Sequence, residues 1–226
     1  MKISLSLAIL ATLVPAALGE LLGQDVSNYQ GSLDWAAQKE AGSHFAYIKA
    51  TESTTYTDAQ FDANYDGAAD AGIIRGAYHF ARPAASSGKE QAQYFLDNGG
   101  GWTNDGKTLP GALDVEFNPD GDTCYGLSTT DMVAWIKEFS DTYKAAVGRP
   151  PAIYTTTSWW NQCTGSNADF GDHPLWLARY ADSAGDPPAG WDTHSIWQFA
   201  DSGTLAGDNN YWNGDEDGLN KFAKGG

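Results

Sequence analysis

Short apolar runs alternate along the chain with longer segments in which apolar residues recur at helical spacing. Runs of β-branched and aromatic residues bounded by turn-forming residues predict strands. They lie at Gln24–Tyr29, Phe45–Thr51, Ile74–Phe80, Ala112–Phe117, Ala152–Thr157, Leu175–Tyr180 and Ser195–Phe199, with a weaker run near Asp217–Asn220.

Three of the intervening segments have the periodicity of amphipathic helices, namely Thr57–Ala71, Ser87–Asn98 and Ser128–Val147. The third has the clearest limits. Ser128 is a typical N-cap residue with Asp131 three positions later, and Gly148 follows the last apolar position. We therefore expect a long helix between these two signals.

Strands that alternate with helices predict a parallel sheet with crossover helices. Seven or eight strands within roughly 200 residues favour an α/β fold, an irregular (β/α) barrel of the TIM type. The segments after Thr157 and Tyr180 are rich in Gly, Asp, Pro and Asn, so we expect shortened or missing helices in the second half. An open doubly wound sheet is the alternative. No Gly-x-Gly-x-x-Gly turn follows a strand, which disfavours a nucleotide site.

The first 19 residues have the pattern of a secretion signal. Lys2 precedes an apolar run from Leu5 to Leu18, and Ala17-Leu18-Gly19 offers small residues to a signal peptidase. We expect residues 1–19 to be removed, leaving one catalytic domain at 20–226 in a secreted protein. A buried N-terminal helix is the alternative.

The chain has two cysteines, Cys124 and Cys163. In an oxidising compartment such a pair usually forms a disulfide, which would stabilise the fold by about 3–4 kcal/mol. Two free thiols are the alternative, although no Cys-His arrangement supports a catalytic cysteine.

The formal net charge of −16 disfavours nucleic acid as a partner, because phosphate contacts need clustered Lys and Arg. No second apolar run is long enough to span a membrane. We expect a monomer. Nine Trp, eleven Tyr and nine Phe offer rings that stack on sugar faces, although packing in the core explains many of them.

The strongest chemical signal is the segment Leu113-Asp114-Val115-Glu116. Side chains alternate along a strand, so Asp114 and Glu116 share one face and the apolar residues share the other. In a (β/α) barrel, catalytic groups lie at the C-terminal ends of strands. Two carboxyls on one buried face repel each other, which raises the pKa of one and suits it to protonate a glycosidic oxygen.

Two other interpretations of this pair remain open. Asp114 and Glu116 would be solvated acids if the strand were an exposed edge, although its apolar residues argue against this. They would be metal ligands if Asp25 and Asp217 completed a site. Glu52 is a further acid that either joins the site or pairs with a base.

Several motifs, taken together, resemble glycoside hydrolase family 25, the Chalaropsis-type lysozymes. The matching segments are Asp25-Val26-Ser27-Asn28-Tyr29-Gln30-Gly31, Tyr47-Ile48-Lys49-Ala50-Thr51-Glu52, Tyr78-His79-Phe80, Leu113-Asp114-Val115-Glu116, Trp197-Gln198 and Asp217-Gly218-Leu219-Asn220. They occur in the family's order over nearly the whole of residues 20–226. Ser53 departs from the family, which usually has Gly there.

The resemblance implies an irregular β/α barrel that cleaves the β-1,4 bond between N-acetylmuramic acid and N-acetylglucosamine in bacterial peptidoglycan. We expect no metal or other cofactor. Glu116 matches the family's acid/base, and Asp114 matches the residue that supports a substrate-assisted step. Asp25 and Asp217 match further acids of the groove, and Glu52 is a candidate only.

Four residues are our candidates for sugar binding: Tyr78, Tyr154, Trp176 and Gln198. A chitinase-like barrel is an alternative, but its Asp-x-x-Asp-x-Asp-x-Glu run is absent before Glu116. A catalytically silent carbohydrate-binding protein is another, although no acid is lost at the matched positions.

Overall fold

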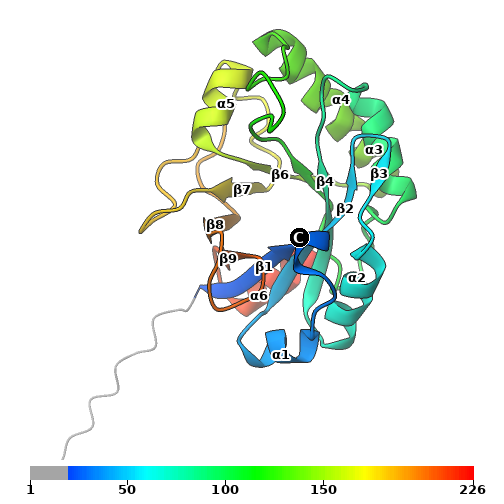
Figure 1. The fold of residues 1–226 in the computed structure, drawn as a ribbon. Helices are drawn as coiled ribbons and strands as arrows, with labels where there is room; N and C mark the ends of the chain where they lie inside the picture. Colours follow the sequence, from blue (N-terminus) through cyan, green and yellow to red (C-terminus); the bar gives the residue numbers. More distant parts are fainter. Residues whose placement is uncertain (1–19) are drawn as a thin grey trace, which may run out of the picture.

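The computed structural model of this protein describes residues 20–226, so the expected signal segment 1–19 lies outside the described residues. One nine-stranded sheet forms the centre of the molecule, in the order β1-β9-β8-β7-β6-β5-β4-β2-β3, and the pairing of β1 with β2 closes it into a barrel (Figure 1). The strands are β1 (Leu21–Val26), β2 (Phe45–Glu52), β3 (Tyr56–Thr57), β4 (Ile74–Phe80), β5 (Ala112–Asp114), β6 (Ala152–Thr155), β7 (Leu175–Ala178), β8 (Ile196–Ala200) and β9 (Asp208–Trp212).

The predicted barrel is confirmed, but its sheet is mixed. Strands β1, β2 and β4–β8 run parallel, whereas β9 is antiparallel to both of its neighbours, β1 and β8. The short β3 lies outside the barrel and forms a hairpin with β2. Because β9 runs in the opposite direction, its first residues lie at the same end of the barrel as the last residues of the parallel strands.

Helices cover the outside of the sheet unevenly. They are η1 (Asn28–Gln30), α1 (Trp35–Glu40), α2 (Phe61–Asp70), α3 (Gly88–Asp97), α4 (Thr129–Val147), α5 (Thr157–Thr164) and α6 (Glu216–Ala223). The three long predicted helices correspond to α2, α3 and α4. After β6 the crossover contains only the short α5, and no helix lies between β7 and β8. The second half therefore has the shortened and missing helices that its composition indicated.

The limits of α4 follow from local chemistry. The Ser128 hydroxyl accepts a hydrogen bond from the Asp131 N–H at 3.2 Å, which satisfies one of the free donors of the first turn. Gly148 ends the helix with a φ of 86°, a left-handed conformation that glycine adopts at no steric cost. The cap and stop expected from the sequence are therefore present.

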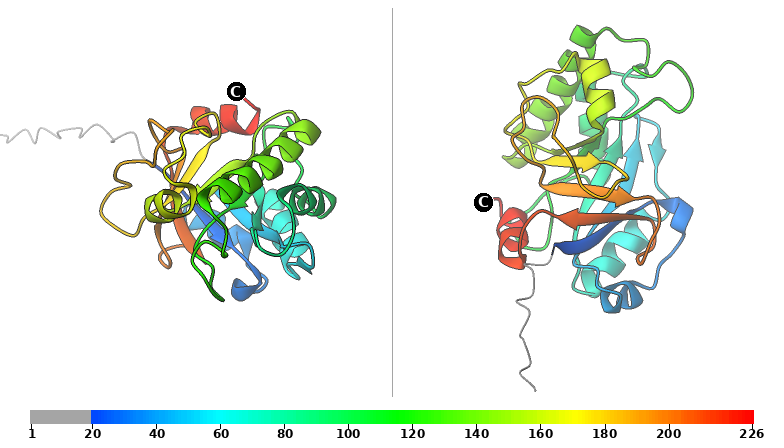
Figure 2. Two further views of the ribbon diagram at one scale, coloured as in Figure 1. Left: turned by 90° about the horizontal axis from the view of Figure 1, so that it is seen from above. Right: turned by 90° about the vertical axis from the view of Figure 1, so that its left-hand side faces the viewer.

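The chain end differs from expectation. Residues Asp217–Asn220, predicted as a weak strand, belong to α6. This helix buries Leu219 and Phe222 against Trp212 and the other apolar side chains of the barrel interior. In the right-hand view of Figure 2, α6 lies at the end of the barrel where β9 finishes, which is opposite to the carboxyl ends of the parallel strands.

A second apolar core lies between the sheet and helices α3, α4 and α5. The predicted disulfide joins Cys124, in the loop after β5, to Cys163 on α5. It therefore links the loop that carries Glu116 to the next crossover. None of the helices within residues 20–226 has both the length and the apolar character needed to cross a bilayer.

Candidate active site

A pocket of about 270 Å³ opens at the carboxyl ends of the parallel strands. It is lined by Asp25, Val26, Ser27, Tyr29, Gln30, Lys49, Tyr78, Phe80, Asp114, Glu116, Tyr154, Trp176, Tyr180, Gln198 and Asp208. This is the end at which (β/α) barrels generally carry their catalytic groups. Of the acids predicted for the site, Asp25, Asp114 and Glu116 lie together here.

Strand β5 positions the central carboxyl pair. Asp114 is its last residue and Glu116 follows two positions later, so both side chains point into the pocket. Leu113 and Val115 point the other way, into the core beneath the helices. The alternation expected from the sequence is present, except that Phe117 is 42% exposed instead of packing beneath the helices.

Asp114 is a buried acid without a protein partner. Its Oδ1 atom is out of contact with solvent and has no hydrogen-bond partner among the described residues. Burial, and then the nearby Glu116 carboxyl, raise the pKa of Asp114 well above its usual value, while Lys49 opposes this shift. A buried acceptor left unsatisfied in the free protein is suited to accept an N–H group of a ligand.

Glu116 has the protonation behaviour of a general acid. Burial raises its pKa to about 7, and the charges of Lys49 and Arg82 oppose the rise. Near neutral pH a large fraction of Glu116 therefore keeps its proton. A carboxyl with a pKa near the working pH donates and accepts protons most effectively.

A hydrogen-bonded network holds the acids on the opposite wall. The amide nitrogen of Gln198 donates to Asp25 at 2.9 Å and to Asp208 at 3.2 Å, and Asn210 donates to Asp25 at 2.7 Å. The hydroxyl of Tyr154 donates to the Gln198 oxygen at 2.8 Å. Burial, and then the Asp208 carboxyl, raise the pKa of Asp25 to about 8 despite the two donors.

The placement of Asp217 requires a correction. Asp217 is exposed in the first turn of α6, and it does not line the pocket. Asp208 occupies the place expected for it, beside Asp25 in the register of β1 and β9. The sequence did not reveal Asp208 because β9 carries polar residues where an apolar strand pattern was sought.

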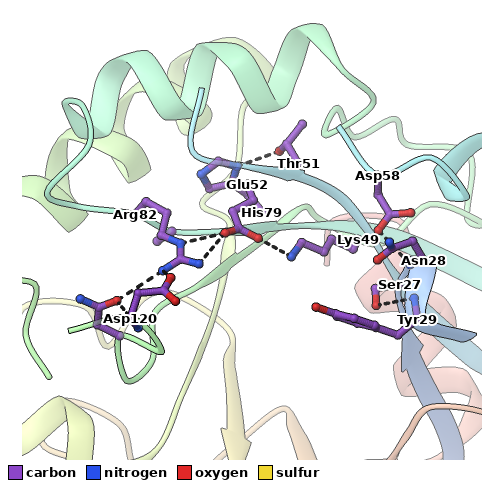
Figure 3. Close-up of polar contacts among 12 residues, drawn as sticks. Ser27, Asn28, Tyr29, Lys49, Thr51, Glu52, Asp58, His79, Arg82 and Asp120 are labelled. Atoms are coloured by element: carbon purple, nitrogen blue, oxygen red, sulfur yellow. Dashed lines mark hydrogen bonds and ion pairs between the residues drawn. The ribbon is translucent and has the colours of Figure 1, made fainter. Parts of the chain in front are cut away.

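Lys49 connects the pocket to a chain of charges outside it (Figure 3). Its ammonium group contacts Glu52 at 2.6 Å, and Arg82 contacts Glu52 at 2.7 Å and Asp120 at 2.9 Å. Partial burial pushes the pKa of Glu52 upward, but the bonds from Lys49 and Arg82 outweigh it and lower the pKa. Glu52 is therefore an ionised anchor for two cations and does not line the pocket.

The four residues expected to bind sugar all line the pocket, but at different depths. Trp176 is 2% exposed, stacks on Tyr47 at 4.7 Å and donates to Asn210, so it forms the floor instead of an open platform. Tyr154 and Gln198 are also buried, and only Tyr78 is partly exposed.

The exposed rings stand at the rim of the pocket. Tyr29 is 89% exposed and Tyr180 is 55% exposed. The sequence did not single them out because an aromatic residue in a loop has no periodic neighbours that mark its direction. Within residues 20–226, no group of three or more His, Cys, Asp or Glu side chains is arranged to hold a metal ion.

Comparison with known proteins places this chain in a family. The model of glycosyl hydrolases family 25 matches residues 24–208. The chain belongs to this family. It is therefore a glycoside hydrolase, and the resemblance seen in its motifs is confirmed.

The relatives of this family 25 hydrolase agree in sequence over most of their lengths. Lysozyme M1 of Streptomyces globisporus is 53% identical over 209 residues, which cover 90% of this chain and 71% of that one. An N,O-diacetylmuramidase of Chalaropsis is 50% identical over 208 residues, which cover 90% and 99%.

Solved structures agree in fold. A muramidase from Acremonium alcalophilum superimposes with a TM-score of 0.89 at 52% identity and covers 91% of this family 25 hydrolase and 100% of its own chain. The bacterial lysozyme from Streptomyces coelicolor has a TM-score of 0.89 at 51% identity and covers 92% and 98%.

Proposed function

We propose that the protein is a secreted lysozyme that cleaves the β-1,4 bond between N-acetylmuramic acid and N-acetylglucosamine in bacterial peptidoglycan. The relatives named lysozyme and N,O-diacetylmuramidase support this substrate class. The observation that carries the mechanism is the pair of Asp114, an acceptor without a partner, and Glu116, an acid with a pKa of about 7.

In this mechanism Glu116 donates its proton to the glycosidic oxygen as the bond to the anomeric carbon breaks. The carbonyl oxygen of the substrate's own 2-acetamido group attacks that carbon and forms a positively charged oxazolinium ring. Water then opens the ring, and Glu116 takes back a proton from the water. Such substrate assistance is a recognised exception to the scheme with two catalytic carboxylates.

Asp114 orients the acetamido group. Its free Oδ1 atom is available to accept the acetamido N–H. This hydrogen bond favours the ionised carboxylate and so lowers the pKa of Asp114 when substrate binds. The carboxylate then stabilises the positive charge of the oxazolinium ring.

Asp25 and Asp208 bind sugar hydroxyls and set the charge of the opposite wall, while Gln198 holds both of them in place. Lys49 limits the accumulation of negative charge around Glu116. Tyr29 and Tyr180 are placed to stack on sugars at the rim.

Secretion is part of the proposal. It is supported by the signal-like residues 1–19 and by the Cys124–Cys163 disulfide, since structural disulfides persist in oxidising compartments. Mass spectrometry of the protein from the culture medium should find a chain that begins near residue 20.

The test of the catalytic assignment is Glu116→Gln, assayed by clearing of bacterial walls, with chitin as the comparison substrate. We expect activity on walls to fall about 100-fold or more, because general acid catalysis contributes that much, while the unfolding transition stays close to wild type. Turnover near the wild-type rate would remove Glu116 from its role. Wild-type activity on chitin alone would favour the chitinase-like alternative.

A further inference from the structure

A second pocket adjoins the catalytic one. It has a volume of about 520 Å³ and is lined by Glu116, Tyr154, Thr156, Thr157, Ser158, Ala178, Arg179 and Tyr180. Glu116, Tyr154 and Tyr180 line both pockets, so the two form one continuous groove. The catalytic steps proposed above take place in the first pocket, and they give the second pocket no role.

Arg179 is the only cation that lines the second pocket. The other described arginines, Arg75, Arg82 and Arg149, all donate hydrogen bonds from their side chains. The Arg179 guanidinium has no hydrogen bond or ion pair with any of residues 20–226. Arg179 is exposed, so in a chain with 29 acidic residues against 13 basic ones it offers a charge beside Glu116 that no described carboxylate takes up.

The backbone of Arg179 is held by its neighbours, and its exposed side chain extends from it along the pocket wall. Its backbone N–H donates to the Gln198 carbonyl at 3.0 Å, and its carbonyl accepts from the Trp197 indole at 2.8 Å. The guanidinium rests directly on Gly185, where any side chain would take its place. The same loop is tied to α5 because the Thr157 hydroxyl donates to the Asp186 carbonyl at 3.3 Å. Both walls of the pocket are thus connected.

The chemistry of the lining selects an anion with hydrogen-bonding oxygens. A guanidinium offers a planar set of donors that matches a carboxylate. The hydroxyls of Thr156 and Ser158 lie 3.1 Å apart at the start of α5; one donates to the other, so the pair leaves one O–H as a neutral donor for a ligand. The sugar rings of peptidoglycan are uncharged, so its carboxylates belong to the stem peptide or, where a muramic acid carries no peptide, to its lactyl group.

We propose that Arg179 binds a carboxylate of the substrate in this second pocket, within one or two sugars of the cleaved bond, and so distinguishes peptidoglycan from uncharged amino-sugar polymers. This assignment rests on the proposed function. It makes Arg179 a specificity-determining residue for a carboxylate carried either by the lactyl group or by the peptide.

The test compares two pairs of soluble substrates. The first pair is a glycan of alternating N-acetylglucosamine and N-acetylmuramic acid with its lactyl carboxylates free or converted to amides. The second pair carries stem peptides with their carboxylates free or amidated. Wild type, Arg179→Gln and the distant exposed control Lys89→Gln, which removes the same charge from α3, are assayed on all four for kcat/KM.

We expect kcat/KM of wild type and of Lys89→Gln to be about tenfold higher for the free carboxylate than for the amide in one of the two pairs. A hydrogen-bonded charge pair provides a difference of this size. Arg179→Gln should lose that preference, and the pair affected identifies the source of the carboxylate. The preference should shrink at high salt. The assignment is overturned if wild type shows no preference in either pair or if Arg179→Gln keeps it. Failure of wild type to cleave any of the four would instead overturn the proposed function, and this assignment with it.

Discussion

At the residue scale, the pKa values of the carboxyl groups in the site depend on the small number of positive charges near them. Lys49 is the only cation among the residues that line the catalytic pocket, which also contains Asp25, Asp114, Glu116 and Asp208. It lowers the pKa values of Asp114 and Glu116, both of which burial raises. The balance between burial and the nearby charges, of which Lys49 has the largest effect, therefore sets the pH range in which Glu116 holds its proton.

Replacement of Lys49 tests that balance. Glu116 must be protonated to act as the acid, so kcat/KM should be lost as pH rises through about 7. Lys49→Met removes a charge that favours ionised Glu116, so the alkaline limb should move to higher pH while the maximal rate falls. The measurement is the pH dependence of kcat/KM, with Lys89→Met as the control. If the alkaline limb of Lys49→Met lies at the same pH as that of wild type, the charge of Lys49 does not act on Glu116.

Asp25 links stability to pH. Its pKa is about 8 in the folded protein against a usual value of 3.8, so between these values the folded chain binds a proton that the unfolded chain has lost. The stabilisation of the folded state by this proton is fully present below about pH 4, and it is lost as the pH rises to about 8. The free energy of unfolding, measured in urea, should fall less for Asp25→Asn than for wild type as the pH is raised from 5 to 8. The exposed Asp217→Asn should follow wild type. Equal slopes for all three would contradict this assignment.

At the element scale, the parts that the sequence revealed are those with regular apolar patterns and strong caps. The parallel strands and helix α4 belong to this class. Strand β9 escaped notice because its inward positions Asp208 and Asn210 are polar, so no apolar alternation marks it. Helix α6 was mistaken for a strand, although Asp215 caps it and Leu219 and Phe222 have helical spacing.

The site residues differ in the same way in how far the sequence alone indicates them. Asp114 and Glu116 were found because two acids alternate with apolar residues along one strand. Asp208 was not, because its position depends on β9 pairing antiparallel with β1. Such a placement follows from tertiary contacts between segments distant in the chain. Arg179 lies at the end of the predicted strand Leu175–Tyr180, but a single basic residue there does not by itself indicate a ligand.

The loop after β5 gives a prediction at this scale. It carries Glu116, and the contacts that hold it include the bond of Arg82 to Asp120 and the disulfide of Cys124 with Cys163. The double variant Cys124→Ser/Cys163→Ser should lose about 2–5 kcal/mol of unfolding free energy. Denaturant titration in the absence of reductant measures this. Unchanged stability would mean that the other contacts of the loop hold it alone.

At the scale of the whole molecule, the two ends of the barrel have different roles. Helix α6 closes one end with apolar side chains and stabilises the barrel. The other end gathers the acids from strands that are distant in sequence, and the groove continues past Glu116 to Arg179. Because β9 runs antiparallel, it brings Asp208 to the same end as Asp25.

We propose that this groove cleaves peptidoglycan on the reducing side of N-acetylmuramic acid. Digestion of purified wall, followed by borohydride reduction and mass spectrometry of the fragments, identifies the sugar at each new reducing end. We predict reduced N-acetylmuramic acid in the products of wild type and none above background with Glu116→Gln. Products that end in reduced N-acetylglucosamine, or no new reducing ends from wild type, would contradict the account.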